Sequence, residues 1–435
     1  MPQTQCLRRA AKPSLPERYA ATRRLSADLV APLSEADATL QSMPDASPAK
    51  WHLAHATWFF ETFLLRDRIP GYRLYDERWP FLFNSYYEAE GERILRARRG
   101  MLSRPTLAEI AGWRTRVDDA MQPLLANPAA APLIELGLAH EQQHQELLLT
   151  DIKHALFQNP LGPAMWGFRD ARTVSSLPGT DEGSNSRACP EAENPSRRSD
   201  VTGAEWLEHP GGVALIGHQG AGFAFDNEGP AHRMLLEPFA LAHRLVTNGE
   251  WEQFVVDGGY RTASLWLSDG WDWVRRERTE APLYWRGGEH FTHSGWLPRD
   301  PAAPVSHISY YEADAFAAWA GARLPTEFEW EAIAQAGDPA AGNQLDRAGA
   351  PLPQGTDELF GDCWQFTRSA YLPYPRFKPA KGAVGEYNGK FMSGQWVLKG
   401  ASCATARGHS RASYRNFFYP HQRWQFTGLR LAKDL

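Results

Sequence analysis

The sequence predicts an α+β protein in which an N-terminal four-helix bundle precedes an irregular, β-rich domain. From about residue 15 to residue 165, apolar residues recur at helical spacing in four main segments joined by loops. From Trp206 onward, the strand-like runs are short, turns are frequent, and Gly and Trp are plentiful. Between these parts, Ser, Pro, Gly and charged residues replace the apolar periodicity. We therefore predict a helical domain over residues 1–170, a linker over residues 171–204 and a second domain over residues 205–435.

The predicted bundle contains one unusually long connection, at residues 66–104, which is rich in aromatic residues and Arg. A connection of that length inside a bundle indicates a functional loop or a packing cover. The predicted helices span residues 16–33, 34–43, 51–65 and 106–125, and a segment around His140 that ends near Phe157.

Two helices are predicted within the β-rich part. The first spans residues 310–320. The second begins after Thr326, because Glu329 stands three residues later and the pair forms a capping box. It runs to about Ala334, and the rest of the domain is expected to consist of short strands and long loops.

Composition and charge exclude several classes of function. A net charge of −5 over 435 residues offers no basic surface for nucleic acid. No run of 18 apolar residues exists, so no transmembrane helix and no membrane partner are expected. The first residues lack the apolar centre of a signal peptide, and the four Cys residues are widely spaced without a CxxC pair. A reduced, cytoplasmic protein is the expectation.

The helix around His140 carries two histidines on one face. His140 and His144 are four residues apart, so on a helix their imidazoles lie one turn apart. The same face continues through Gln143, Leu147 and Asp151, in a stripe where a core helix would carry Leu throughout. Glu146 projects to nearly the opposite side and is not expected to be a ligand.

A third histidine donor comes from the helix at residues 51–65, which contains His52 and His55. An isolated His pair at this spacing is more often a surface pair or a hydrogen-bonded core pair, and a third His on another amphipathic helix makes a metal site an equal alternative. Imidazole suits Fe, Zn, Cu and Ni alike, so the spacing leaves the metal open.

Five motifs together resemble the EgtB-type sulfoxide synthases, the non-heme iron enzymes of ergothioneine biosynthesis. Each motif is common alone, but their order and combination are specific, and the resemblance runs from about residue 18 to residue 432. The motifs are Ser47-Pro48-Ala49-Lys50-Trp51-His52-Leu53-Ala54-His55, His140-x3-His144-x-Glu146, Asp226-Asn227-Glu228-x-Pro230-x-His232, Asn248-x-Glu250-Trp251 and Arg323-Leu324-Pro325-Thr326-Glu327.

This resemblance implies a DinB-like four-helix bundle followed by a formylglycine-generating-enzyme-like, C-type-lectin-like domain. It also implies an Fe(II) site formed by His55, His140 and His144, with positions left for hercynine, a chalcogen donor and dioxygen. His52 stands where other members carry Asp, which is why His55 is taken as the ligand.

The resemblance also implies a pocket for hercynine, the trimethylated betaine of histidine. Gln143 matches the residue that contacts the hercynine imidazole, and Asn416 matches the residue that holds its carboxylate. Phe417 and Phe418 would wall the pocket, where aromatic faces suit a trimethylammonium group. Ordinary core packing of the two Phe residues and a turn-capping role for Asn416 remain alternatives.

Tyr86 and Tyr87 match a tyrosine pair that members of this subtype bring near the iron. A phenol there can act as a catalytic proton donor. The alternative is that one or both tyrosines simply cover the bundle. Asp151, two turns beyond His144, is a weaker candidate for holding a ligand imidazole by its outer N–H.

Some positions depart from the family pattern and point to an altered donor substrate. Cys363-Trp364-Gln365-Phe366-Thr367 replaces V-W-E-W-T, so Gln365 loses a charge and becomes a candidate contact for a neutral donor. Residues 91–96 replace G-P-R-H-P-R. These changes favour the selenoneine synthase branch (SenA), which couples a seleno-sugar to hercynine. The alternative is an ergothioneine enzyme that uses cysteine or γ-glutamylcysteine, with the departures as drift.

Two other classes of function remain open. The second domain resembles lectin-like folds, so the chain can be read as a metal-stabilised sugar-binding module without turnover. A zinc-dependent thiol transferase is a further reading. An oxidative enzyme would consume oxygen only when both substrates are present, whereas the binding module and the thiol transferase would consume none.

Overall fold

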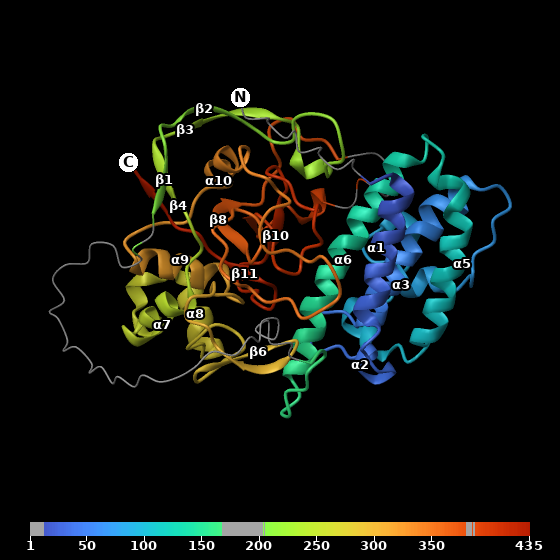
Figure 1. The fold of residues 1–435 in the computed structure, drawn as a ribbon, viewed down its shortest axis with the longest axis horizontal. Helices are drawn as coiled ribbons and strands as arrows, with labels where there is room; N and C mark the ends of the chain where they lie inside the picture. Colours follow the sequence, from blue (N-terminus) through green and yellow to red (C-terminus); the bar gives the residue numbers. More distant parts are fainter. Residues whose placement is uncertain (1–12, 168–202, 204, 380–384, 386–387) are drawn as a thin grey trace, which may run out of the picture.

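The computed structural model describes residues 13–167, 203, 205–379, 385 and 388–435. The helical bundle and the β-rich domain lie side by side, and α6 is the bundle helix that faces the β-rich domain (Figure 1). The α+β class, with a helical domain first and a β-rich domain second, confirms the prediction from sequence. The predicted linker, residues 171–204, lies almost wholly outside the described residues, so the domain boundaries remain a prediction.

Capping boxes begin three helices of the bundle, at Ser14, Ser34 and Thr106, where each side chain accepts the backbone N–H three residues later. The helix predicted over residues 34–43 is shorter in the structure, because the chain becomes extended at Leu40. The helices are α1 (Leu15–Val30), α2 (Glu35–Thr39), α3 (Ala49–Phe60), which continues as the π-helical η1 (Glu61–Arg66), α4 (Trp79–Phe83), α5 (Leu107–Leu125) and α6 (Ala131–Phe157).

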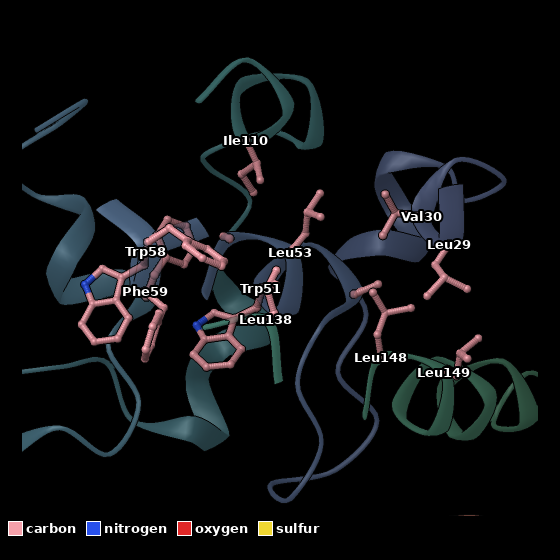
Figure 2. Close-up of a cluster of buried hydrophobic side chains, with 14 of the residues drawn as sticks. Leu29, Val30, Trp51, Leu53, Trp58, Phe59, Ile110, Leu138, Leu148 and Leu149 are labelled. Atoms are coloured by element: carbon pink, nitrogen blue, oxygen red, sulfur yellow. The ribbon is translucent and has the colours of Figure 1, made fainter. Parts of the chain in front are cut away.

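The bundle core is built mainly from α3, whose 12 residues are all buried. It packs against α6 on one side and α5 on the other. Gly137 permits the close approach of α6, since a Cβ there would meet the Phe60 ring at 2.8 Å. Figure 2 shows the resulting cluster, which includes Leu29, Val30, Trp51, Leu53, Trp58, Phe59, Ile110, Leu138, Leu148 and Leu149.

The β-rich domain contains small sheets rather than one large sheet. In its described part, β10 (Asn416–Phe418), β9 (Trp396–Lys399), β8 (Trp364–Ala370) and β11 (Thr427–Gly428) form one sheet in that order, with only β8 and β11 parallel. The remaining strands are β1 (Trp206–His209), β4 (Phe239–Ala242) and β12 (Ala432–Asp434) in a second sheet, the hairpin of β2 (Gly212–Ile216) and β3 (His232–Leu236), and the meander of β5 (Trp285–Arg286), β6 (Glu289–Thr292) and β7 (Gly295–Pro298).

Four α-helices accompany these strands in the described part of the domain. The predicted capping box is confirmed, because Thr326 accepts from Glu329 N at the start of α10. Thr247 and Ser309 cap two others in the same way. The helices are α7 (Asn248–Val256), α8 (Ser268–Glu277), α9 (Tyr310–Trp319) and α10 (Glu327–Ala334).

The two domains meet along α6, through polar side chains on successive turns. Gln143 Nε2 donates to the Tyr414 hydroxyl at 2.7 Å, and the Glu146 carboxylate accepts from Trp364 Nε1 at 2.8 Å. Farther along, Trp424 Nε1 donates to Asp151 Oδ1 at 3.0 Å. The interface therefore holds polar groups in fixed positions beside the histidine face of α6. Across the described ranges, no helix has the length and apolar character needed to cross a membrane.

Candidate metal centre and substrate cavity

Three histidines converge between α3 and α6. One nitrogen each from His55, His140 and His144 lies within 4.8 Å of the others, and this is the group of possible metal ligands found among the described residues. His55 Nε2 and His140 Nε2 are 3.1 Å apart. Convergence follows from the sequence, since the i, i+4 spacing stacks two imidazoles on α6 and packing against α3 supplies the third.

Burial shapes the electrostatics of the centre. Burial lowers the pKa of His55 and His144 well below the ordinary value and lowers the pKa of His140 to about 3. His55 is also sandwiched between the rings of Trp51 and Trp58, with centroids 4.7 and 5.4 Å away. Neutral imidazoles in fixed orientations are the form that binds metal cations.

Contacts on the outer side of the His55 and His144 rings decide which of their nitrogens faces inward. His55 Nδ1 donates to the Phe83 carbonyl at 2.6 Å, which leaves Nε2 for the centre. His144 Nδ1 lies 2.9 Å from His52 Nδ1, and His52 Nε2 lies 3.0 Å from Asp151 Oδ2. Asp151 thus reaches a candidate ligand through His52 rather than directly as predicted.

A cavity of about 240 Å³ opens beside the histidines and is closed on its far side by the β-rich domain. Leu147 and Asp151, which share the histidine face of α6, also line it. The structure also brings nine of the predicted site residues to this cavity, namely His55, Tyr86, Tyr87, His140, Gln143, His144, Asn416, Phe417 and Phe418.

The predicted hercynine contacts come from both domains. Gln143 is held by the Tyr414 hydroxyl, and Asn416 lies in β10, paired with Leu398 of β9. The Phe417 ring stacks on Tyr371 with centroids 4.2 Å apart, so its position is fixed by core packing even though it lines the cavity. Phe417 is therefore both packed in the core and part of the cavity lining, and its contact with hercynine stays a prediction.

The two tyrosines differ in their surroundings. Tyr87 is buried and packs against Trp58 and Phe63. Tyr86 is half-buried, and its hydroxyl accepts a hydrogen bond from Arg96. The Tyr86 phenol therefore lies in a polar, hydrogen-bonded setting at the cavity.

The guanidinium groups of Arg96 and Arg99 lie in the cavity wall. Among the described residues, neither has a carboxylate within ion-pair distance. Arg99 is buried, donates to Ser47 and Ser85 at 2.9 and 3.2 Å, and lies 3.4 Å over the Trp51 ring. Burial and neighbouring Arg96 lower the pKa of Arg99 to about 9. This side of the cavity is consequently suited to an anionic group.

Gln365 is the predicted site residue that the structure does not bring to the cavity. It is fully buried in β8, accepts from Trp330 Nε1 at 2.7 Å and Arg430 Nε at 3.0 Å, and donates to the Leu359 carbonyl at 2.7 Å. Side chains alternate along a strand, so its neighbour Trp364 faces the cavity while Gln365 faces the domain core.

Several cavity residues were not predicted as site residues from sequence. Glu146 is one of them. On a helix it points away from the histidine face, and the sequence does not show that the second domain covers that side. Arg99 and Trp424 are others, and neither belongs to a pattern with a recognisable signal. His52 could be noticed in the sequence, because it stands one helical turn before His55 in the WHLAH segment, but the partner of its ring could not be inferred.

Fold and site together define a two-domain protein in which a three-histidine centre of a helical bundle opens onto a cavity walled by a β-rich domain. Residues 18–148 match the DinB superfamily, and residues 191–357 match the sulfatase-modifying factor enzyme 1-like domain.

Relatives match over nearly the whole chain. The hercynine oxygenase of Mycobacterium tuberculosis is 32% identical over 92% of this chain and 94% of its own length. The hercynine oxygenase of Mycolicibacterium smegmatis is 31% identical over 98% of this chain and 100% of its own length. The hercynine oxygenase of Mycolicibacterium thermoresistibile is 31% identical over 92% of this chain and 90% of its own length. This chain belongs to the hercynine oxygenase family.

Proposed function

We propose that this protein is a non-heme Fe(II) enzyme that uses dioxygen to couple a sulfur donor to the imidazole carbon of hercynine that lies between the two ring nitrogens. The observation that carries the proposal is the convergence of His55, His140 and His144 at the wall of a cavity lined by polar and aromatic side chains. In this reaction the C–H of hercynine and the S–H of the donor are lost, a C–S bond forms, and dioxygen supplies the sulfoxide oxygen and leaves its second atom as water.

The histidine set fits iron. Three neutral nitrogens on one side of a cation leave the other side open toward the cavity, as in oxygen-using iron centres. Iron bound there would supply the redox chemistry between donor and dioxygen. The two Nε2 atoms 3.1 Å apart can share at most one hydrogen bond without a cation, whereas both lone pairs are used when a cation lies between them.

The chain's own residues would bind and orient hercynine. Gln143 can hydrogen-bond its imidazole, and Asn416 can hold its carboxylate. The aromatic faces of Phe418 and Trp424 line the same cavity and suit the trimethylammonium group. Tyr86, hydrogen-bonded to Arg96, is positioned to donate a proton in the cavity.

The guanidinium groups favour an anionic donor. Arg96 and Arg99 lie in the cavity wall, and among the described residues neither has a carboxylate within ion-pair distance, so a carboxylate of cysteine or γ-glutamylcysteine could pair with them directly. Gln365, which argued from sequence for a neutral donor, faces the domain core instead.

One observation favours the second candidate, selenoneine synthase with a seleno-sugar donor. Amide side chains are numerous in the cavity wall, and the buried Gln425 Oε1 has no hydrogen-bond partner in the described structure. Amides and aromatic rings are suited to sugar hydroxyls, and a neutral sugar would leave the guanidinium charge uncompensated.

The test is an anaerobically iron-loaded assay with hercynine, divided among cysteine, γ-glutamylcysteine and a seleno-sugar, with products read by mass spectrometry after air is added. A sulfoxide adduct from either thiol supports the proposal. A selenium adduct from the seleno-sugar alone supports the second candidate. His140→Ala serves as the control, and normal iron content and turnover in that variant would refute the metal assignment.

A further inference from the structure

A continuous line of hydrogen bonds leads outward from His144 through His52 to Asp151. The Nδ1 atoms of the two imidazoles are 2.9 Å apart, and the far nitrogen of His52 is 3.0 Å from Asp151 Oδ2. His52 and Asp151 are both buried. His144 and Asp151 lie on α6, whereas His52 lies on α3, so the line crosses the packing interface of the two helices and returns.

Proton positions in this line follow from the carboxylate. An ionised Asp can only accept, so the nitrogen of His52 that faces it carries the proton. A neutral His52 then presents a lone pair at Nδ1, and the short contact to His144 requires that His144 Nδ1 be the donor. His144 Nε2 is left as a lone pair facing the other two histidines.

Asp151 is itself held on both oxygens. The backbone N–H of Ser47 donates to Oδ2 at 2.8 Å, and the indole N–H of Trp424 donates to Oδ1 at 3.0 Å. These donors keep Asp151 an acceptor and fix its orientation. Because Trp424 belongs to the β-rich domain, the line ends on the opposite side of the domain interface.

We infer that His52 and Asp151 are positioning residues that lock His144 in the Nδ1–H tautomer and so present Nε2 to the metal. This inference rests on the metal site of the proposed function. It differs from the arrangement at His55, where a backbone carbonyl performs the same task and no side chain can be exchanged. Imidazole partners of this kind change metal affinity by about 10- to 100-fold when removed.

The test uses the full chain with Co(II) alone as the probe, read by its visible absorption in competition with a chelator, and histidine side-chain ¹⁵N spectra of the metal-free protein. His52→Gln keeps an acceptor and a donor, whereas His52→Leu removes both. Asp151→Asn keeps the shape but can reverse the direction of the hydrogen bonds. His154→Leu, on the same helix but outside the line, is the matched control.

Expected results are a Co(II) affinity about 10- to 100-fold weaker in His52→Leu and in Asp151→Asn, and nearly unchanged in His52→Gln and His154→Leu. The ¹⁵N spectra should show His144 protonated at Nδ1 in the parent and redistributed between tautomers in the two weakened variants. Unchanged affinity and an unchanged His144 tautomer in His52→Leu and Asp151→Asn would overturn the inference.

Failure of the metal site is distinguishable from failure of the inference. If the parent binds no Co(II), or if His140→Ala binds it as well as the parent, the metal site is refuted. The tautomer spectra need no metal, so they still decide whether His52 and Asp151 control the His144 ring.

Discussion

Lys153 provides a sharp physical test of the domain interface. It lies on α6, is 3% exposed, and forms no ion pair within the described residues. Its ammonium nitrogen is 2.7 Å from His307 Nε2 and lies over the Tyr284 and Phe426 rings at 4.6 and 5.0 Å. Burial lowers the pKa of Lys153 from 10.5 to about 7.

The sign of the pH dependence follows from proton binding. Between pH 7 and about pH 10.5 the unfolded chain keeps the lysine proton while the folded chain has lost it, so stability rises with pH in this window. For these two pKa values, the Lys153 contribution to the free energy of unfolding rises by about 2.5 kcal/mol from pH 6 to pH 9. Other buried groups also titrate, so the variant must be compared with the parent at each pH.

Lys153→Met removes the titrating group while keeping an unbranched apolar stem. The unfolding free energy of this variant minus that of the parent should fall by about 2.5 kcal/mol from pH 6 to pH 9. The loss of a partner for His307 adds a cost of about 1–3 kcal/mol that does not follow the Lys153 titration. Urea unfolding followed by Trp fluorescence at each pH measures the difference.

Lys50 offers the matched control, since it is also 3% exposed but is ion-paired with Glu35 at 2.8 Å. Lys50→Met should run parallel to the parent between pH 6 and pH 9. The reasoning is refuted if Lys153→Met runs parallel to the parent as well, because Lys153 would then keep the same protonation in the folded and unfolded states.

Three further predictions concern the bundle and the cavity. Glu141→Gln leaves two buried guanidinium groups, of Arg23 and Arg114, short of their common carboxylate, and should destabilise the protein by about 3–5 kcal/mol in urea unfolding at pH 7. Because those arginines, against the opposing effect of burial, hold the pKa of Glu141 at about 2, this loss should be constant above pH ~5 and shrink as the pH falls toward 2. Gln365→Glu should leave the preference among donors unchanged in competition assays, and a changed preference would show that Gln365 acts on the cavity. Arg96→Met should raise the KM for a thiol donor with a carboxylate by about 10-fold or more and change the KM for hercynine less; equal KM changes would argue against an anion contact.

Helical periodicity explains why the bundle and the histidine centre could be predicted. On α6 a spacing of four residues places two imidazoles on one face in any packing arrangement, and capping boxes mark helix starts within a residue. The third donor, His55, was chosen over His52 by resemblance. The structure shows both near His144, with His55 facing the centre and His52 behind the ligand.

The long connection after η1 was predictable only as a functional loop or cover. Its run Arg96-Ala97-Arg98-Arg99 has the composition of a solvated charged segment, and only tertiary packing places Arg99 over the Trp51 ring. The prediction that Gln365 contacts the donor does not agree with the structure, for a different reason. The motif comparison identified the right strand, but the direction of one side chain depends on which face of β8 meets α6, and a motif does not state that face.

The contacts along α6 argue that the centre and the second domain are one structural unit. Each turn from Gln143 to Asp151 presents a polar side chain to a partner in the β-rich domain, through Tyr414, Trp364 and Trp424. Without that domain the Glu146 carboxylate would lose Trp364, Ser402 and Thr405 as donors. Asp151 would lose one of the donors that keep it an acceptor toward His52. If His52 and Asp151 position His144 as inferred above, a change at the cavity wall that moves Trp424 reaches the candidate ligand through two hydrogen-bonded side chains.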